Sequence, residues 1–328
     1  MITFVAMSRI LTGIQATGTP HLGNILGAIL PAIEISKQSE HDSYLFIADL
    51  HAMTQIKNGQ ELHENTLKTA ACWLACGLDA EKTVFYRQSM VPQVTELMWY
   101  LLCQFPFQRL SLAHSFKDKA DRLEDVNGGL FSYPMLMAAD ILLYDANIVP
   151  VGKDQKQHIE FTRDVASKFN AKFGEVLIIP EESISETSMY VTGTDGQKMS
   201  KSKGNTIDIF LPEKQLKKQI MSIVSDSTPL EDPKDPDKCS VFALYSLLCS
   251  DTERETMRNN YLNGNYGFGH AKTALFELIL GRFKVEREKF TYLMANTGEI
   301  TRILEEGEKK AFSTAKEVLK RVRKALSF

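Results

Sequence analysis

The alternation of strand and helix patterns through about the first 200 residues most constrains the fold of this chain. Five short apolar segments are typical of strands, namely RILTGI, SYLFIAD, TVFYRQ, NIVPVG and EVLIIP. Helical patterns lie between them at about 23–37, 61–76, 92–104, 131–144 and 155–173. Parallel neighbouring strands need a long crossover connection, which a helix usually supplies. We therefore expect an α/β structure with a doubly wound parallel sheet.

The strand patterns stop near Asn205, and only helical patterns follow. They cover residues 213–224, 240–249, 269–293 and 299–326, with the linker TPLEDPKDPDK between the first two. A chain of 328 residues exceeds the size that one core usually supports. We therefore expect two domains, an α/β domain over residues 1–206 and an all-α helical domain over residues 207–328.

The composition is that of an ordinary globular protein, with 44% hydrophobic and 24% charged residues. No apolar run reaches the length of a membrane span, and the N-terminus MITFVAMSRIL lacks a signal-peptide layout. We therefore expect a cytoplasmic protein with no membrane partner. The five cysteines show neither CxxC pairs nor Cys/His metal spacing, which predicts reduced core residues and no metal site. The net charge of −3 argues neither for nor against a nucleic-acid partner.

The run Lys198-Met199-Ser200-Lys201-Ser202 carries the strongest chemical signal. It lies in the polar, glycine-bearing stretch GTDGQKMSKSKGN, which reads as a loop. Two ammonium groups on a loop can stabilise negative charge on a departing phosphate. The alternative is a solvated surface run, which is the usual fate of lysine and serine in loops.

A second element, TGIQATGTPHLGN, spans Thr12 to Asn24 and reads as strand, tight turn and helix start. Gly13, Gly18 and Gly23 permit tight turns and close approach of the backbone to a ligand. Backbone amides at a helix N-terminus can bind phosphate. The spacing is not GxGxxG, so the segment is no dinucleotide fingerprint, and a purely structural glycine turn is the alternative.

Together the two elements resemble the signature motifs of class I aminoacyl-tRNA synthetases, HIGH (here His21-Leu22-Gly23-Asn24) and KMSKS. The resemblance implies a Rossmann-like catalytic domain that binds ATP and stabilises the transition state of aminoacyl-adenylate formation. It implies catalytic roles for Lys198, Lys201, His21 and Asn24. Three further segments, VPVGKDQKQHIE, ADLHAMT and YPMLMAADILLY, are similar to those of bacterial-type tryptophanyl-tRNA synthetases. The likeness covers nearly the whole catalytic half, and the helical half matches mainly in layout.

The helix YPMLMAAD points to the amino acid that is bound. Tyr133, Met137 and Asp140 recur at helical spacing on one face. A carboxylate can accept a hydrogen bond from an indole N–H, and methionine packs well against a large ring. Tyrosine enzymes of this class usually carry glutamine where this chain has Met137, which favours tryptophan. The alternative is a core helix with one capping or paired aspartate. The cost of burying a carboxylate without a partner in so apolar a segment argues against that alternative.

The remaining site assignments are implied by the resemblance alone. ATP contacts are expected at Gln15, Ala16, Thr17, Gly23, Asn24, Gly152, Lys153, Asp154, Val191, Lys198, Met199, Ser200, Lys201, Ser202 and Lys117. Tryptophan contacts are expected at Asp140, Tyr133, Met137, Gln155, Gly13 and His51. For His51 and Lys117 the alternatives are a structural histidine after a strand and a surface lysine.

Two departures from the family pattern stand out. Many bacterial relatives carry TIGN where this chain has His21 at the first position, which is compatible with ATP binding. The loop before KMSKS is the short GTDGQ, and Val191 is chosen as the adenine contact.

The resemblance implies a two-step reaction. Tryptophan and ATP, with Mg²⁺, would form tryptophanyl-adenylate and pyrophosphate, and the tryptophanyl group would then pass to the 3′-terminal ribose of tRNA(Trp). The helical half would recognise the anticodon, and the chain would form a homodimer. The alternatives are a tyrosyl-tRNA synthetase and a non-catalytic paralogue that senses tryptophan or binds RNA.

The last helical segment ends in KEVLKRVRKAL, which carries Lys316, Lys320, Arg321, Arg323 and Lys324. Cations at a helix C-terminus complement its dipole. The alternative is a patch that meets tRNA phosphates.

Overall fold

The computed structural model describes residues 8–38, 41–113, 126–150, 152, 156–181 and 189–328. Three parallel strands form its sheet, β1 (Ser8–Gln15), β2 (His41–Ala48) and β3 (Val84–Arg87), in the order β1-β2-β3. The register runs from Ser8 opposite His41 to Gln15 opposite Ala48, and from Tyr44 opposite Val84 to Ile47 opposite Arg87. The expected α/β class with a parallel sheet is confirmed.

Two single parallel bridges continue the sheet beyond β1. Ile148 pairs with Ile10 on one side and with Glu181 on the other. The spatial order is therefore β3, β2, β1, Ile148, Glu181, and it reverses direction in sequence between β1 and Ile148. In such sheets ligands bind at the carboxyl ends of the strands beside this reversal. Among the described residues the fourth and fifth expected strands are reduced to these bridges, and Pro150 and Pro180 lack the N–H that a ladder requires.

Helical elements link the strands. After β1 come α1 (Leu22–Asn24), the π-helical η1 (Ile25–Ile29) and α2 (Leu30–Ser36), one continuous helical segment. After β2 come α3 (Asp49–Ala52) and α4 (Gly59–Ala75), and after β3 come η2 (Gln88–Met90), α5 (Gln93–Gln104) and α6 (Phe107–Leu110). The helices α8 (Gly128–Leu142) and α9 (Lys156–Phe173) follow. Asn58 and Asn127 cap α4 and α8 by accepting from Glu61 N and Leu130 N, as short polar side chains do at helix starts.

The second half is helical, as expected. It contains η4 (Lys201–Lys203), α10 (Glu213–Met221), η5 (Pro236–Lys238), α11 (Ser240–Ser246), α12 (Asp251–Leu262), α13 (Phe268–Arg282), α14 (Lys284–Ala295) and α15 (Thr297–Ala325). The single helix expected over 269–293 is wrong, because the chain leaves helical geometry at Phe283 and so separates α13 from α14. The sequence patterns did not predict α12, in which only Met257 and Tyr261 are buried.

The sheet has an apolar core on each face. Along β2, Leu45 and Ile47 belong to one core and Tyr44 and Phe46 to the other, as the alternation of a strand requires. The first core continues through Met199 and Ile207 into the helical half. The second includes side chains from α5, α8, α9 and α15.

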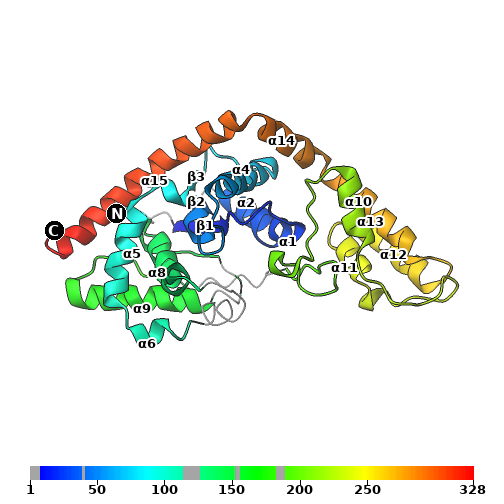
Figure 1. Cartoon of the computed structure of the whole chain (residues 1–328), viewed down its shortest axis with the longest axis horizontal. Coiled ribbons are helices and arrows are strands. Elements are labelled where there is room, and N and C mark those ends of the chain that lie inside the picture. Colours follow the sequence, from blue (N-terminus) through cyan, green and yellow to red (C-terminus); the bar gives the residue numbers. More distant parts are fainter. Residues whose placement is uncertain (1–7, 39–40, 114–125, 151, 153–155, 182–188) are drawn as a thin grey trace, which may run out of the picture.

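The molecule is an arch with the sheet near its middle (Figure 1). The helices α5, α6, α8 and α9 lie on one side of the sheet, and α10–α13 form the opposite end (Figure 1). The long α15 runs back over the sheet to the side of α5 (Figure 1), where Arg323 pairs with Glu96. The expected boundary at residue 206 stays a prediction. Within the described ranges, no helix combines the length and apolarity needed to cross a bilayer.

Candidate active site

The helix start at the end of β1 is organised by two reciprocal hydrogen bonds. His21 caps α1, and its Nδ1 accepts from Asn24 N at 3.2 Å while Asn24 Oδ1 accepts from His21 N at 3.2 Å. Burial, followed by the charge of Lys201, lowers the pKa of His21 to about 4. The ring is therefore neutral near pH 7. Because Nδ1 is an acceptor, Nε2 carries the proton and can donate to a ligand.

The KMSKS segment is held as a short hairpin. Thr192 and Lys198 form an antiparallel bridge, and Met199 N donates to Val191 O at 2.8 Å. The buried Asn205 lies at its centre, because its Oδ1 accepts from Ser200 N at 2.7 Å and its Nδ2 donates to Asp195 Oδ1 at 2.7 Å and to Lys198 O at 3.1 Å. Our sequence analysis gave Asn205 no role.

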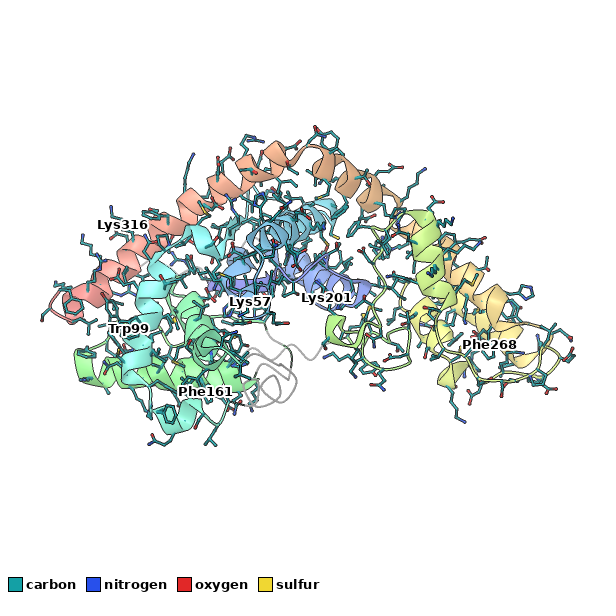
Figure 2. The ribbon with its side chains drawn as sticks, in the orientation of Figure 1. Lys57, Trp99, Phe161, Lys201, Phe268 and Lys316 are labelled. Atoms are coloured by element: carbon teal, nitrogen blue, oxygen red, sulfur yellow. The ribbon has the colours of Figure 1, made fainter. Side chains whose placement is uncertain are left out.

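The two signature motifs meet in the structure. Gly23 N donates to Met199 Sδ at 3.4 Å across 176 residues of sequence. Lys201 Nζ donates to Gly18 O at 2.8 Å, and Lys201 lies beside the helical segment that begins with α1 (Figure 2). The second lysine of KMSKS is therefore already placed at the turn before the helix start.

The two lysines of KMSKS differ in their surroundings. Lys198 is exposed, whereas Lys201 is half-buried. Burial lowers the pKa of Lys201 to about 8, and the charge of Asp208 opposes that shift. A desolvated ammonium interacts more strongly with a nearby anion than a solvated one does.

The carboxylate of Asp140 lies in a buried polar network. His51 Nε2 donates to its Oδ2 at 2.8 Å, and Gln88 Nε2 donates to Oδ1 at 2.8 Å and to Oδ2 at 2.9 Å. Burial raises the pKa of Asp140, and the bonds from His51 and Gln88 oppose the rise. Protein groups from α3 and η2 thus partner this aspartate. The expected contact of Asp140 with tryptophan stays a prediction.

Tyr133 lies beside this network. Its ring packs edge-on against His51 and His158, and its hydroxyl lies 3.0 Å from His158 Nε2. A cavity of about 150 Å³ opens beside Tyr133. It is lined by Leu50, Met53, Thr54, Met98, Asn127, Gly129, Ser132, Tyr133 and Leu136. Met137 is half-buried on the same helix.

The structure brings together some of the other expected site residues. Gln15 ends β1, with Ala16 and Thr17 following it toward the turn at Gly18. Gly13 lies where a Cβ would overlap the Phe46 ring, so glycine is required there. Ser200 and Ser202 place their hydroxyls 2.9 Å apart, and the half-buried Gly152 follows the Ile148 bridge. Lys117, Lys153, Asp154 and Gln155 lie outside the described residues.

Two further residues of this region received no role in the sequence analysis. Gln88 and Asp49 directly follow β3 and β2, at the carboxyl ends where ligand sites form. That position was the available signal for both. Among the residues that the structure describes, no group of three His, Cys, Asp or Glu side chains could hold a metal ion.

The basic end of α15 is partly engaged within the molecule. Arg321 pairs with Asp145 and also donates to Val176 O, and Arg323 pairs with Glu96. These two arginines therefore hold the helix against the first half. Lys316, Lys320 and Lys324 are exposed.

Comparison with known proteins agrees with this geometry. Residues 6–326 match the model of a family described as tRNA synthetases class I (W and Y). A tryptophan–tRNA ligase of Campylobacter jejuni (strain RM1221) is 46% identical over 314 residues, which cover 96% of this chain and 98% of that protein. One from Fusobacterium nucleatum is 46% identical over 318 residues, 97% of each chain.

A solved structure shows the same likeness. The crystal structure of tryptophanyl-tRNA synthetase from Campylobacter jejuni, complexed with ADP and tryptophan, has a TM-score of 0.92 and 45% sequence identity to this chain. The match covers 98% of this chain and 100% of that one.

Proposed function

This chain belongs to the class I tRNA synthetases for tryptophan and tyrosine, and we propose that it uses its two joined signature motifs to attach L-tryptophan to tRNA(Trp). The contacts of Gly23 with Met199 and of Lys201 with Gly18 carry the proposal, because they set a helix start that can bind phosphate beside a half-buried cation. Relatives named tryptophan–tRNA ligase, matched over nearly their whole length, favour tryptophan over tyrosine.

In the first step the tryptophan carboxylate attacks the α-phosphorus of ATP. A new O–P bond forms, the bond to the bridging oxygen of the β-phosphate breaks, and pyrophosphate leaves with its charge. No covalent protein nucleophile is needed, because positioning and charge stabilisation carry such a step. Lys201 gives up Gly18 O for a phosphate oxygen, and Lys198 approaches from the exposed side of the hairpin.

His21 and Asn24 hold the nucleotide as neutral donors. The low pKa of His21 keeps its ring uncharged, so its Nε2–H offers a directed hydrogen bond. The backbone amides at the start of the helical segment supply the remaining donors. The ATP roles of Gln15, Ala16, Thr17, Gly152, Lys153, Asp154, Val191 and Lys117 remain proposals that rest on the family likeness.

Asp140 selects the amino acid by accepting the indole N–H. Among the described residues, its Oδ1 is engaged by Gln88 alone, so an acceptor site remains on that oxygen. Phenylalanine offers no ring donor, so its binding would leave a buried acceptor unpaired. Such an unpaired acceptor disfavours the wrong amino acid by a factor of about 10⁴. Tyr133 and Met137 are proposed to border the ring. The contacts of Gln155 and His51 with the amino acid's polar groups are proposals that rest on the family likeness.

In the second step the terminal ribose hydroxyl of tRNA attacks the acyl carbon of the adenylate. The ester bond forms, AMP leaves, and the hydroxyl proton goes to solvent or to a phosphate oxygen.

The helical part after Asn205 recognises the anticodon. Mg²⁺ enters with ATP and is held mainly by its phosphates. The reaction takes place in the cytoplasm.

The active form is a homodimer. The side of the molecule formed by α5 and α6 exposes large apolar side chains, including Trp99 and Phe107, and Leu112 follows α6. Trp99 is labelled on α5 in Figure 2. Such a patch on a soluble chain indicates a protein contact. Light scattering during size-exclusion chromatography at micromolar concentration is expected to give twice the chain mass of 37.0 kDa.

The decisive experiment is ATP–pyrophosphate exchange with each of the twenty amino acids. Exchange that depends on tryptophan alone supports the proposal. Exchange with tyrosine would establish the tyrosine alternative, and absence of exchange with every amino acid would indicate a non-catalytic paralogue.

A further inference from the structure

Gln88 occupies an unusual position in the buried network. It is the first residue of η2 after β3 and is only 2% exposed. Its Oε1 accepts from Leu50 N at 3.1 Å and from His51 N at 3.4 Å. Its Nε2 donates to both oxygens of Asp140. One amide therefore joins three elements, α3, η2 and α8.

The chemistry of these partners fixes which way the amide points. Backbone N–H groups only donate, so the face toward Leu50 and His51 must be the carbonyl oxygen. A carboxylate only accepts, so the face toward Asp140 must be the NH₂ group. Rotating the amide by 180° would set its NH₂ group against the N–H groups of Leu50 and His51. It would also set its carbonyl oxygen against the Asp140 carboxylate. Gln88 therefore has a single low-energy orientation.

The segment that carries Gln88 is held on two other sides. Asp49 accepts from Ser89 Oγ at 2.5 Å and from Ser89 N at 2.9 Å, so α3 and η2 each bond the other's backbone. Arg87 pairs through two nitrogens with Glu308 of α15, at 2.5 and 3.1 Å, and both side chains are largely buried. These contacts fix the backbone from which the Gln88 side chain extends.

We propose that Gln88 is a positioning residue for amino-acid selection, which holds the Asp140 carboxylate in one orientation and leaves a single acceptor site for the indole N–H. The inference rests on the proposed role of Asp140 in tryptophan recognition. Within the described part of the chain, His51 is the donor that remains to the carboxylate without Gln88. The carboxylate then rotates about its last torsion and loses a donor that stabilises its charge.

Two variants test the proposal by exchange kinetics. Gln88→Leu removes both donor and acceptor, and Gln88→Glu keeps the shape while replacing the donor by an oxygen. Both are expected to raise the KM for tryptophan about 10- to 100-fold, with the KM for ATP changed less than about 2-fold. Gln215→Leu, an exposed glutamine on α10, is the control and is expected to match the wild type. Thermal melts of each variant establish folding.

The glutamate variant adds a pH signature that a merely structural role would not produce. Two carboxylates that face each other hold a shared proton, so the affinity of Gln88→Glu for tryptophan is expected to recover as pH falls from 8 to 6. The wild type is expected to show no such recovery. A flat profile in a folded Gln88→Glu protein with normal tryptophan KM would overturn the proposal.

A double-mutant cycle separates this inference from the proposed function. If Gln88 acts through Asp140, then adding Gln88→Leu to Asp140→Ala produces no further rise in tryptophan KM, and an additive rise contradicts it. If Asp140→Ala alone leaves tryptophan KM unchanged, the proposed role of Asp140 fails and the inference with it. If Asp140→Ala raises KM but Gln88→Leu does not, only the inference fails.

Discussion

The proposed amino-acid side and nucleotide side of the site differ in burial and in hydrogen bonding. Asp140, His51 and Gln88 are 2–4% exposed and hydrogen-bonded to one another from three elements. On the nucleotide side, Lys198 and Ser202 are exposed, and Lys201 donates to the Gly18 carbonyl. Under the proposed roles, the groups that select the amino acid are held by hydrogen bonds before the substrate arrives, whereas the charged groups have fewer contacts and more solvent exposure. We therefore expect selection to depend on rigidity and acceleration on charges that can adjust to the departing phosphate.

Removing the central acceptor of the rigid side is expected to have the largest effect. Asp140→Ala should lower kcat/KM for tryptophan in exchange by about 10³-fold or more, because a buried partner of the indole N–H is lost. ATP binding, measured by equilibrium dialysis, should change little. Equal loss of both substrates would show that Asp140 supports the whole site and does not select the amino acid.

Removing the buried cation of the mobile side should slow chemistry without weakening tryptophan binding. For Lys201→Ala we expect adenylate formation in a single turnover to slow by about 10²- to 10³-fold. Lys203→Ala is the matched control, since this exposed lysine in the same segment donates to Gln197 and lies away from Gly18 O, the partner of Lys201. A normal single-turnover rate in Lys201→Ala would remove that lysine from the transition state.

The packing of α15 against β3, which supports the amino-acid side of the site, can be tested through the free energy of unfolding. A Cβ at Gly307 of α15 would lie 1.9 Å from the Phe85 carbonyl oxygen, so Gly307→Ala must push the helix away from β3. We expect a loss of about 2–4 kcal/mol in the free energy of unfolding, measured with urea. Gly298→Ala in the same helix, where a Cβ meets nothing within 4 Å, should stay within about 1 kcal/mol of wild type. Equal effects of the two changes would argue against the close contact.

The smallest expected effect concerns the pH dependence of the nucleotide side. The pKa of His21 is about 4 in the folded chain and 6.5 in the unfolded one, so between these values only the unfolded chain takes up the proton. The wild type therefore loses stability as pH falls from 6.5 to 4. His21→Asn keeps a good helix cap but does not titrate. After a discount for solvent screening, the wild type should lose about 1–2 kcal/mol more than this variant, and parallel curves would contradict the buried neutral ring.

Local patterns identified the elements and the helix that bears Asp140. The spacing of Tyr133 and Asp140 could be recognised from the sequence because both residues lie within one helix. The cost of a buried carboxylate indicated that Asp140 needs a hydrogen-bonding partner. The partners themselves lie 89 and 52 residues away in sequence, at the ends of two other strands. No local pattern specifies such a pairing, because it depends on the order of strands in the sheet.

The misjudged elements have equally physical causes. Segment 269–293 has a helical pattern throughout, but the non-helical backbone at Phe283 separates α13 from α14, which pack on different neighbours. The helix α12 was not predicted because the apolar face of its sequence, DTERETMRNNYL, is too narrow to give a helical periodicity. The roles assigned to Lys117, Lys153, Asp154 and Gln155 stay predictions.

The packing of α15 has a consequence for how the protein is made. Ala311, Ala315, Leu319 and Val322 complete the same apolar core as β2 and β3, although they are translated about 220 residues after β3. While the ribosome is still synthesising the helical part, the emerging sheet exposes Val84 and Tyr86 on an unfinished surface. Such exposed surface promotes aggregation of nascent chains. The sheet keeps this exposure until α15 emerges and packs on β3.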